Sequence, residues 1–96
     1  MCTSIVEIVE AEGSTKNGGR WFALSHAVVA YDHPQHALLE DAIMIDFVNH
    51  DQGPSARTAV ELTLESAKDL QGALAKAIAA AELEEGERSE RLELVA

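Results

Sequence analysis

The spacing of apolar residues changes once along this chain, near residue 64, and this change constrains the fold more than any other feature. Before it, short runs rich in β-branched residues alternate with turn-forming segments, a pattern typical of β-strands. After it, apolar residues recur at helical spacing from Ala67 to Ala81. The sequence therefore predicts several strands followed by one helix, and its 96 residues suffice for a single domain.

Four strands are predicted, each ended by a turn signal. The segment GSTKNGG separates the first two and predicts a hairpin, while Pro34 and Gly53-Pro54 interrupt the pattern later. The predicted strands cover residues 3–11, 20–31, 42–49 and 57–63. We expect an α+β domain, in which a four-stranded antiparallel sheet (ββββ) carries one C-terminal helix packed on one face.

The C-terminal stretch is set apart by its charge. Six of the seventeen acidic residues lie between Glu82 and Glu93, opposed there only by Arg88 and Arg91. We therefore expect a single ββββα domain over residues 1–83. Residues 84–96 are expected to form an acidic tail that is helical at first and frayed beyond Gly86.

Strand alternation divides the side chains of the sheet into two sets. One set is apolar or small almost throughout and suits packing under the helix. The other is also mostly apolar, but each strand contributes one polar residue near its middle: Glu7, His26, Asp46 and Glu61. A face this apolar needs cover from a second copy of the chain or from a ligand. Dimerisation through this second face also suits a small, mainly aliphatic core, since only 4% of the residues are aromatic.

Two functional interpretations follow from these four polar residues. In the first, a dimeric protein binds a metal or a small organic molecule on its open sheet face and carries out isomerase-, cyclase- or lyase-like acid–base chemistry. His26 would then be the base or a ligand, with Glu7, Asp46 and Glu61 as its catalytic partners. In the second, the protein is a non-catalytic dimeric binding or structural module, and the apolar face is its interface. The first is slightly favoured because three histidines would lie on one side of the sheet, but whether the protein is an enzyme stays open.

The segment YDHPQHALLED raises the question of a metal site. His33 and His36 fit two zinc or copper ligands held on a turn, and His26 or Asp32 could be a third. The segment lacks the tighter HExxH or CxxC spacings of recognisable zinc sites. A strand-connecting loop shaped by Asp32 and Pro34 is therefore the alternative.

The charge of the chain argues against several classes of partner. Its formal net charge is −10, and no basic stripe is present to bind nucleic acid or an anionic membrane surface. No run approaches the roughly 18 to 20 apolar residues of a membrane span, and the acidic N-terminal segment is unlike a signal peptide. A single cysteine excludes an internal disulfide. We expect a cytoplasmic protein.

Three segments, MCTSIVEIVEAEG, YDHPQHA and ELTLESA, together resemble a group of small, largely uncharacterised actinobacterial proteins. The acidic tail departs from the resemblance. The resemblance implies a bacterial cytosolic protein, and it supplies neither an activity nor a site residue.

Overall fold

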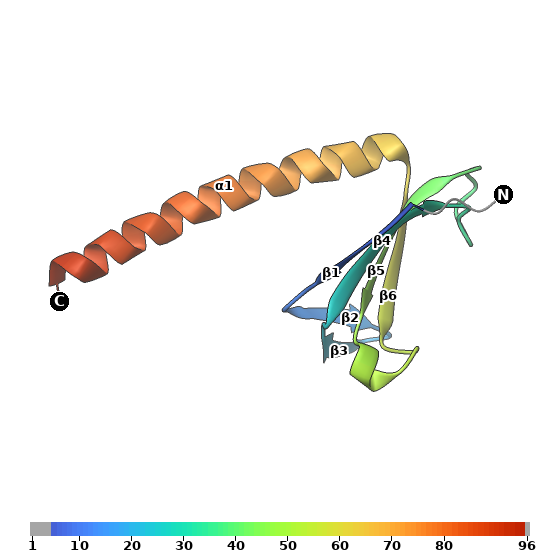
Figure 1. Cartoon of the computed structure of the whole chain (residues 1–96), viewed down its shortest axis with the longest axis horizontal. Coiled ribbons are helices and arrows are strands. Elements are labelled where there is room, and N and C mark those ends of the chain that lie inside the picture. The colour runs from blue at the N-terminus through green and yellow to red at the C-terminus, as the bar shows by residue number, and fades with distance from the viewer. Residues whose placement is uncertain (1–4, 96) are drawn as a thin grey trace. The chain divides into compact units, whose positions relative to one another are not determined.

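The computed structural model of the protein describes the backbone of residues 5–95 and the side chains of residues 5–92 (Figure 1). It consists of two compact units, Met1–Leu64 and Glu65–Ala96. The elements are β1 (Ile5–Glu10), β2 (Ser14–Asn17), β3 (Arg20–Ala23), β4 (His26–Asp32), β5 (Ala42–Val48), the 3-10 turn η1 (His50–Gln52), β6 (Arg57–Leu62) and α1 (Leu64–Val95).

The first unit is built on an antiparallel sheet with the strand order β1-β4-β5-β6. The predicted α+β class, the four-stranded antiparallel sheet and the single C-terminal helix are confirmed. Positions 3 and 4 of the first predicted strand lie outside the described residues.

The N-terminal hairpin differs from the prediction because it is bent. The predicted strand 20–31 is divided into β3 and β4, and the predicted turn segment itself contains β2, which pairs with β3 in a small second sheet. Glu10 pairs with His26, but the next pair is Ser14 with Ala23, so three residues of one strand oppose two of the other. This extra residue is a β-bulge, and it bends the hairpin at Gly13, whose φ is 151°.

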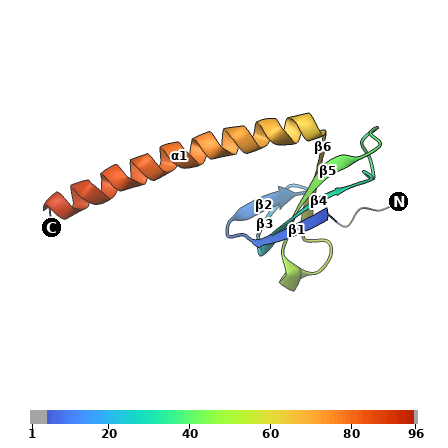
Figure 2. The same cartoon turned by 45° about the horizontal axis from the view of Figure 1, so that its top comes forward.

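The tip of the hairpin is a tight turn at Gly18 and Gly19, both with positive φ, which glycine adopts at low cost. Beyond the bend, β2 lies beside β6, as Figure 2 shows. The side chain of Asn17 donates to the carbonyl of Arg57 at 2.7 Å, and the Thr58 hydroxyl donates to the carbonyl of Lys16 at 3.1 Å. The hairpin tip is therefore anchored to the opposite edge of the four-stranded sheet.

Asn49 holds the bend in place from the end of β5. Its side-chain amide donates to the carbonyl of Ala23 at 2.8 Å, and its amide oxygen accepts from the N–H of Asp51 at 2.9 Å. Its own backbone N–H donates to the carbonyl of Ala56. Asn49 is buried, and these bonds satisfy its polar groups.

The pairing register defines two faces of the four-stranded sheet, because directly paired residues share a face. The first, called the His26 face, consists of Val6, Ile8, Glu10, His26, Val28, Ala30, Asp32, Ala42, Met44, Asp46, Val48, Arg57, Ala59 and Glu61. The second, called the Ile45 face, consists of Ile5, Glu7, Val9, Ala27, Val29, Tyr31, Ile43, Ile45, Phe47, Thr58, Val60 and Leu62. Among the described residues the only buried hydrophobic ones are three alanines, and no large apolar side chain is fully buried.

The second unit is a single helix of 32 residues. It contains Gly86 without interruption, so the described part of the acidic segment is helical as far as Val95. Three of its apolar residues, Leu70, Leu74 and Ile78, recur at helical spacing and are each about half exposed. No helix in the described part of the chain is long and apolar enough to cross a membrane.

Candidate functional site

The structure brings three of the four candidate catalytic residues onto one face. His26, Asp46 and Glu61 all belong to the His26 face. Glu7 does not, because it pairs with Val29 and therefore lies on the Ile45 face. The bulge is the cause. A regular hairpin extended from the Asn17–Arg20 pair would have placed Glu7 opposite Ala30, on the same face as His26.

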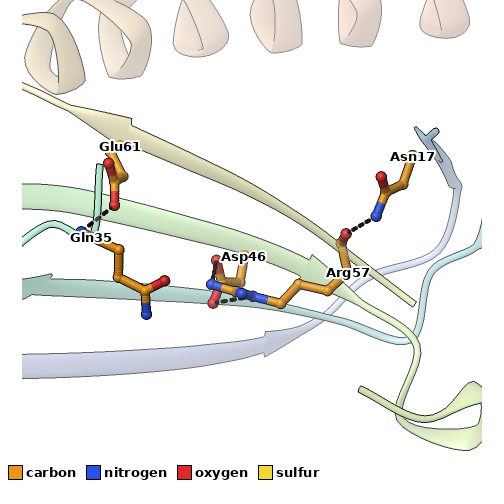
Figure 3. A network of polar contacts seen from close by, with 5 residues as sticks. All are labelled: Asn17, Gln35, Asp46, Arg57 and Glu61. Atoms are coloured by element: carbon orange, nitrogen blue, oxygen red, sulfur yellow. Dashed lines mark hydrogen bonds and ion pairs between the residues drawn. The ribbon is translucent and has the colours of Figure 1, made fainter. Parts of the chain in front are cut away.

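Asp46 is engaged by Arg57, two positions along the neighbouring strand. Its two carboxylate oxygens lie 3.1 Å from Nη2 and 3.1 Å from Nε of the guanidinium, a bidentate arrangement (Figure 3). Arg57 also supplies the carbonyl that accepts from Asn17. The Asp46 carboxylate is thus part of an ion pair that links β5 to β6.

Glu61 is engaged by the loop that follows β4. Its carboxylate accepts hydrogen bonds from the backbone N–H groups of Gln35 at 2.6 Å, Ala37 at 2.8 Å and His36 at 3.1 Å. The Gln35 contact is drawn in Figure 3. The N–H of Ala37, with those of Gln35 and His36, lowers the pKa of the Glu61 carboxyl below its ordinary value of 4.5. The side chain therefore fixes the histidine loop as an anion.

His33 is held at the other end of this loop. Its Nδ1 lies 2.9 Å from the carbonyl oxygen of Glu40 and 3.2 Å from a carboxylate oxygen of Asp41. The hydrogen bond to Glu40 raises the pKa of His33 above its ordinary value of 6.5, and the charge of Asp41 acts in the same direction. The imidazole thus closes the loop across seven residues of sequence.

The three candidate metal ligands do not meet in one site. His33 follows the end of β4 and His26 starts it, so the length of the strand, about 20 Å, lies between them. His36 contributes its backbone N–H to Glu61. In the described part of the chain, no group of three histidine, cysteine, aspartate or glutamate side chains is placed to hold a metal ion.

His26 lies instead in a cluster with Ser25 and His50. Its Nδ1 is 2.8 Å from Oγ of Ser25, and its ring stacks on that of His50 with 4.2 Å between the centroids. The Ser25 hydroxyl accepts from the N–H of His50 at 2.9 Å and donates to the carbonyl of Val48 at 3.2 Å. When the hydroxyl hydrogen points at Val48, Nδ1 of His26 is the donor and Nε2 is the free acceptor.

The sequence analysis did not select His50 or Ser25. The sequence did contain a signal for His50. In an antiparallel pair the start of β4 lies beside the end of β5, and His50 comes two residues after that end. Next to this cluster, at the bend of the hairpin, is an open hollow of about 520 Å³. It is lined by Glu10, Ala11, Glu12, Leu24, Ser25 and His26. Two carboxylates and an imidazole at one hollow favour a cationic or hydrogen-bonding ligand over an anionic one.

A model of a family of unknown function (DUF6295) matches residues 1–87 of the chain. The chain belongs to this family. The expectation of a largely uncharacterised family is confirmed, and DUF6295 assigns no activity to any residue. Comparison with curated proteins and with solved structures gave no match. The DUF6295 match covers the whole sheet unit and ends inside α1, so the last described residues of the helix lie beyond it.

Proposed function

We propose that the protein is a non-catalytic module that works as a homodimer. The observation that carries this proposal is the exposure of β1 on both of its faces. Val6 and Ile8 on one face, and Ile5 and Val9 on the other, are between 51% and 61% exposed. One helix can cover only one face of a sheet. A chain with apolar residues open on both faces needs a second surface to cover them.

The helix carries a second open apolar surface. Leu70, Leu74 and Ile78 recur at helical spacing on α1 and are each about half exposed. Burial of apolar surface contributes roughly 25 cal/mol for each Å² removed from water, so a partner that covers such a stripe stabilises the assembly.

The placement of the three carboxylates predicted to act with His26 supports a non-catalytic role. The Asp46 carboxylate is bound by Arg57, and the Glu61 carboxylate by the loop after β4. Glu7 lies on the other face from His26. A general acid–base pair needs two side chains that reach one substrate atom, and the Asp46 and Glu61 carboxylates are instead engaged in holding the fold.

Sedimentation velocity of the full chain over a hundredfold range of protein concentration tests the proposal. We expect a species of twice the 10.3 kDa chain mass at micromolar concentration. A species of 10.3 kDa at every concentration would overturn it. The His26→Ala variant adds a second test. In a non-catalytic module this substitution changes the melting temperature or the dimer dissociation constant, and it does not abolish the binding of a ligand or metal.

A second candidate function is supported by the cluster of Ser25, His26 and His50 beside the hollow that contains Glu10 and Glu12. In this candidate the protein binds a small organic molecule, or a divalent metal such as zinc or copper, and His26 acts as base or ligand. The acid–base chemistry expected from the sequence would then take place at the bend of the hairpin.

Elemental analysis of the tag-free protein distinguishes metal bound at the cluster of His26 and His50 from metal bound at the loop that contains His33 and His36. Three samples are compared: the unaltered chain, His26→Ala/His50→Ala, and His33→Ala/His36→Ala. Metal lost only from the first variant would place the ion at the cluster, and metal lost only from the second would place it at the loop. If none of the three samples contains metal, a small organic molecule remains as the ligand of this candidate function.

A further inference from the structure

The outer edge of β1 is unlike the other edge of the sheet. β1 and β6 are the two edge strands of the order β1-β4-β5-β6. On β6, the carbonyl of Arg57 already accepts from Asn17, and Thr58 is bonded to the β2 backbone. All six residues of β1 are exposed. Within β1 there is no proline, lysine or bulge, three of the features by which edge strands avoid pairing with another chain, and its only charged residues are Glu7 and Glu10.

The hydrogen-bond pattern shows which residues of β1 face this edge. The N–H of Ala11 donates to the carbonyl of Ser25, so residue 11 points toward β4. Peptide groups alternate in direction along a strand, and odd-numbered residues of β1 therefore bond to β4. The N–H and C=O groups of Val6, Ile8 and Glu10 therefore point away from the sheet, and no other strand of residues 5–95 pairs with them.

The same alternation is found independently at the far side of the sheet. The N–H of Asn49 donates to Ala56, which makes the odd-numbered residues of β5 bond to β6. The even-numbered residues of β5 then bond to β4, and the odd-numbered residues of β4 bond to β1. Both routes give the same outward set on β1.

We infer that β1 pairs antiparallel with β1 of a second copy of this chain, around a two-fold axis at Ile8, so that two four-stranded sheets become one. This inference rests on the proposed dimeric function and assigns the interface. The sequence of β1, IVEIVE, presents two apolar residues and one glutamate on each face. Pairing therefore brings apolar side chains together on both faces at once.

Charge selects the register of this pairing. The outward residues of two β1 strands can bond to each other with the axis at Ile8, at Glu7 or at Val9. The axis at Val9 pairs only residues 8–10 of β1, whereas the other two pair five residues each. With the axis at Glu7, two glutamates would face each other at about 4.5 Å between Cα atoms, in a chain whose net charge is already −10. With the axis at Ile8, Glu7 faces Val9 of the second copy and Glu10 faces its Val6. No glutamate then lies directly opposite another.

Disulfide trapping in the full-length chain tests the register. In a Cys2→Ser background, Ile8→Cys places two thiols on directly paired residues, whose Cα atoms are about 5.5 Å apart, a distance that a disulfide spans. The matched control, Val6→Cys, lies on the same strand and the same face. With the axis at Ile8, Val6 of one chain faces Glu10 of the other. The two cysteines at position 6 are then four residues apart along the strands, about 14 Å, which is too far for a disulfide. We expect the oxidised Ile8→Cys chain to run as a covalent dimer and the Val6→Cys chain to remain unlinked.

A proline pair tests the edge without any thiol. Ile8→Pro removes an N–H that the sheet unit does not use, so the fold persists, and the dimer dissociation constant rises by about a hundredfold as two hydrogen bonds are lost. Val9→Pro removes an N–H that bonds to β4 and unfolds the strand. Equal trapping of both cysteine variants, or an Ile8→Pro chain that sediments as the unaltered dimer, would overturn the β1 interface while leaving the dimeric function in place. A monomeric unaltered chain would overturn both.

Discussion

The carboxylate of Glu61 lies 2.6 Å from the backbone nitrogen of Gln35, a residue that is 26 positions earlier in the sequence. Together with its bonds to His36 and Ala37, this contact makes one side chain of β6 the anchor of the loop between β4 and β5. His36 therefore owes its placement to Glu61, whereas His33 is held by Glu40 and Asp41.

Replacing Glu61 should therefore release the loop without unfolding the sheet. In Glu61→Ala we expect the amides of Gln35, His36 and Ala37 to exchange with deuterium about tenfold faster or more, because the carboxylate that accepts from all three is gone. Glu61→Gln keeps one carbonyl oxygen and should give an intermediate effect. Glu40→Gln is the matched control, since Glu40 contributes its backbone carbonyl to the loop. Unchanged exchange in Glu61→Ala would show that the loop is held by other contacts.

The order of this loop should depend on pH in a definite direction. The lowered pKa of Glu61 means that its contribution is present above pH 4.5 and is lost as the pH falls through its folded-state pKa. The raised pKa of His33 means that its contribution is present below pH 6.5 and is lost as the pH rises through its folded-state pKa. Protection of the loop amides, corrected for intrinsic exchange, should be greatest between these two values. A carboxyl resonance of Glu61 that titrates above 4.5 would contradict this.

The Asp46–Arg57 ion pair should make a small contribution to stability. Its side chains are 28% and 44% exposed, so water screens their attraction. A double-mutant cycle with Asp46→Asn and Arg57→Gln, measured by urea unfolding at one fixed protein concentration, should give a coupling free energy of about 0.5 to 1 kcal/mol. The coupling should fall in 1 M salt. A coupling near zero would mean that the pair has no net effect on the stability of the sheet.

Asn49 should matter more than any other polar side chain of the bend. Asn49→Ala leaves the carbonyl of Ala23 and the N–H of Asp51 without their partners, and should lower the free energy of unfolding by about 2 kcal/mol. Asn49→Asp keeps the acceptor for Asp51 and removes the donor to Ala23, so it separates the two bonds. The control is Gln52→Ala, on the exposed turn that follows. Equal melting temperatures for Asn49→Ala and the control would refute the role of Asn49.

The sequence predicted the elements better than their connections. Turn signals and the change of apolar spacing located the four strands of the main sheet and the helix, because local conformational preferences decide those features. The bulge between Glu10 and Ser14 could not be predicted, since one unpaired residue leaves the alternation of each strand intact. That single residue moved Glu7 to the other face.

The candidate site was predicted in part for the same reason. Alternation alone placed His26, Asp46 and Glu61 on one face, and the structure agrees. The partners of these residues come from other segments: Arg57 for Asp46, the loop N–H groups for Glu61, and His50 for His26. Such contacts depend on the register between strands and on loop paths, neither of which the composition of a strand determines.

The twice-repeated triplet IVE gives β1 a property that alternating strands lack. An ordinary half-buried strand has an inside and an outside, and turning it over exposes its apolar residues to water. β1 carries the same mixture on either side, so the one-residue insertion that turns it over costs little in hydrophobic burial. A chain in which that insertion was deleted would keep a sheet of nearly equal stability while exchanging the positions of its glutamates. Either face of β1 can therefore lie on the same side of the sheet as His26. Turning the strand over exchanges Glu10 for Glu7 beside His26 and leaves the other three strands of the sheet unchanged.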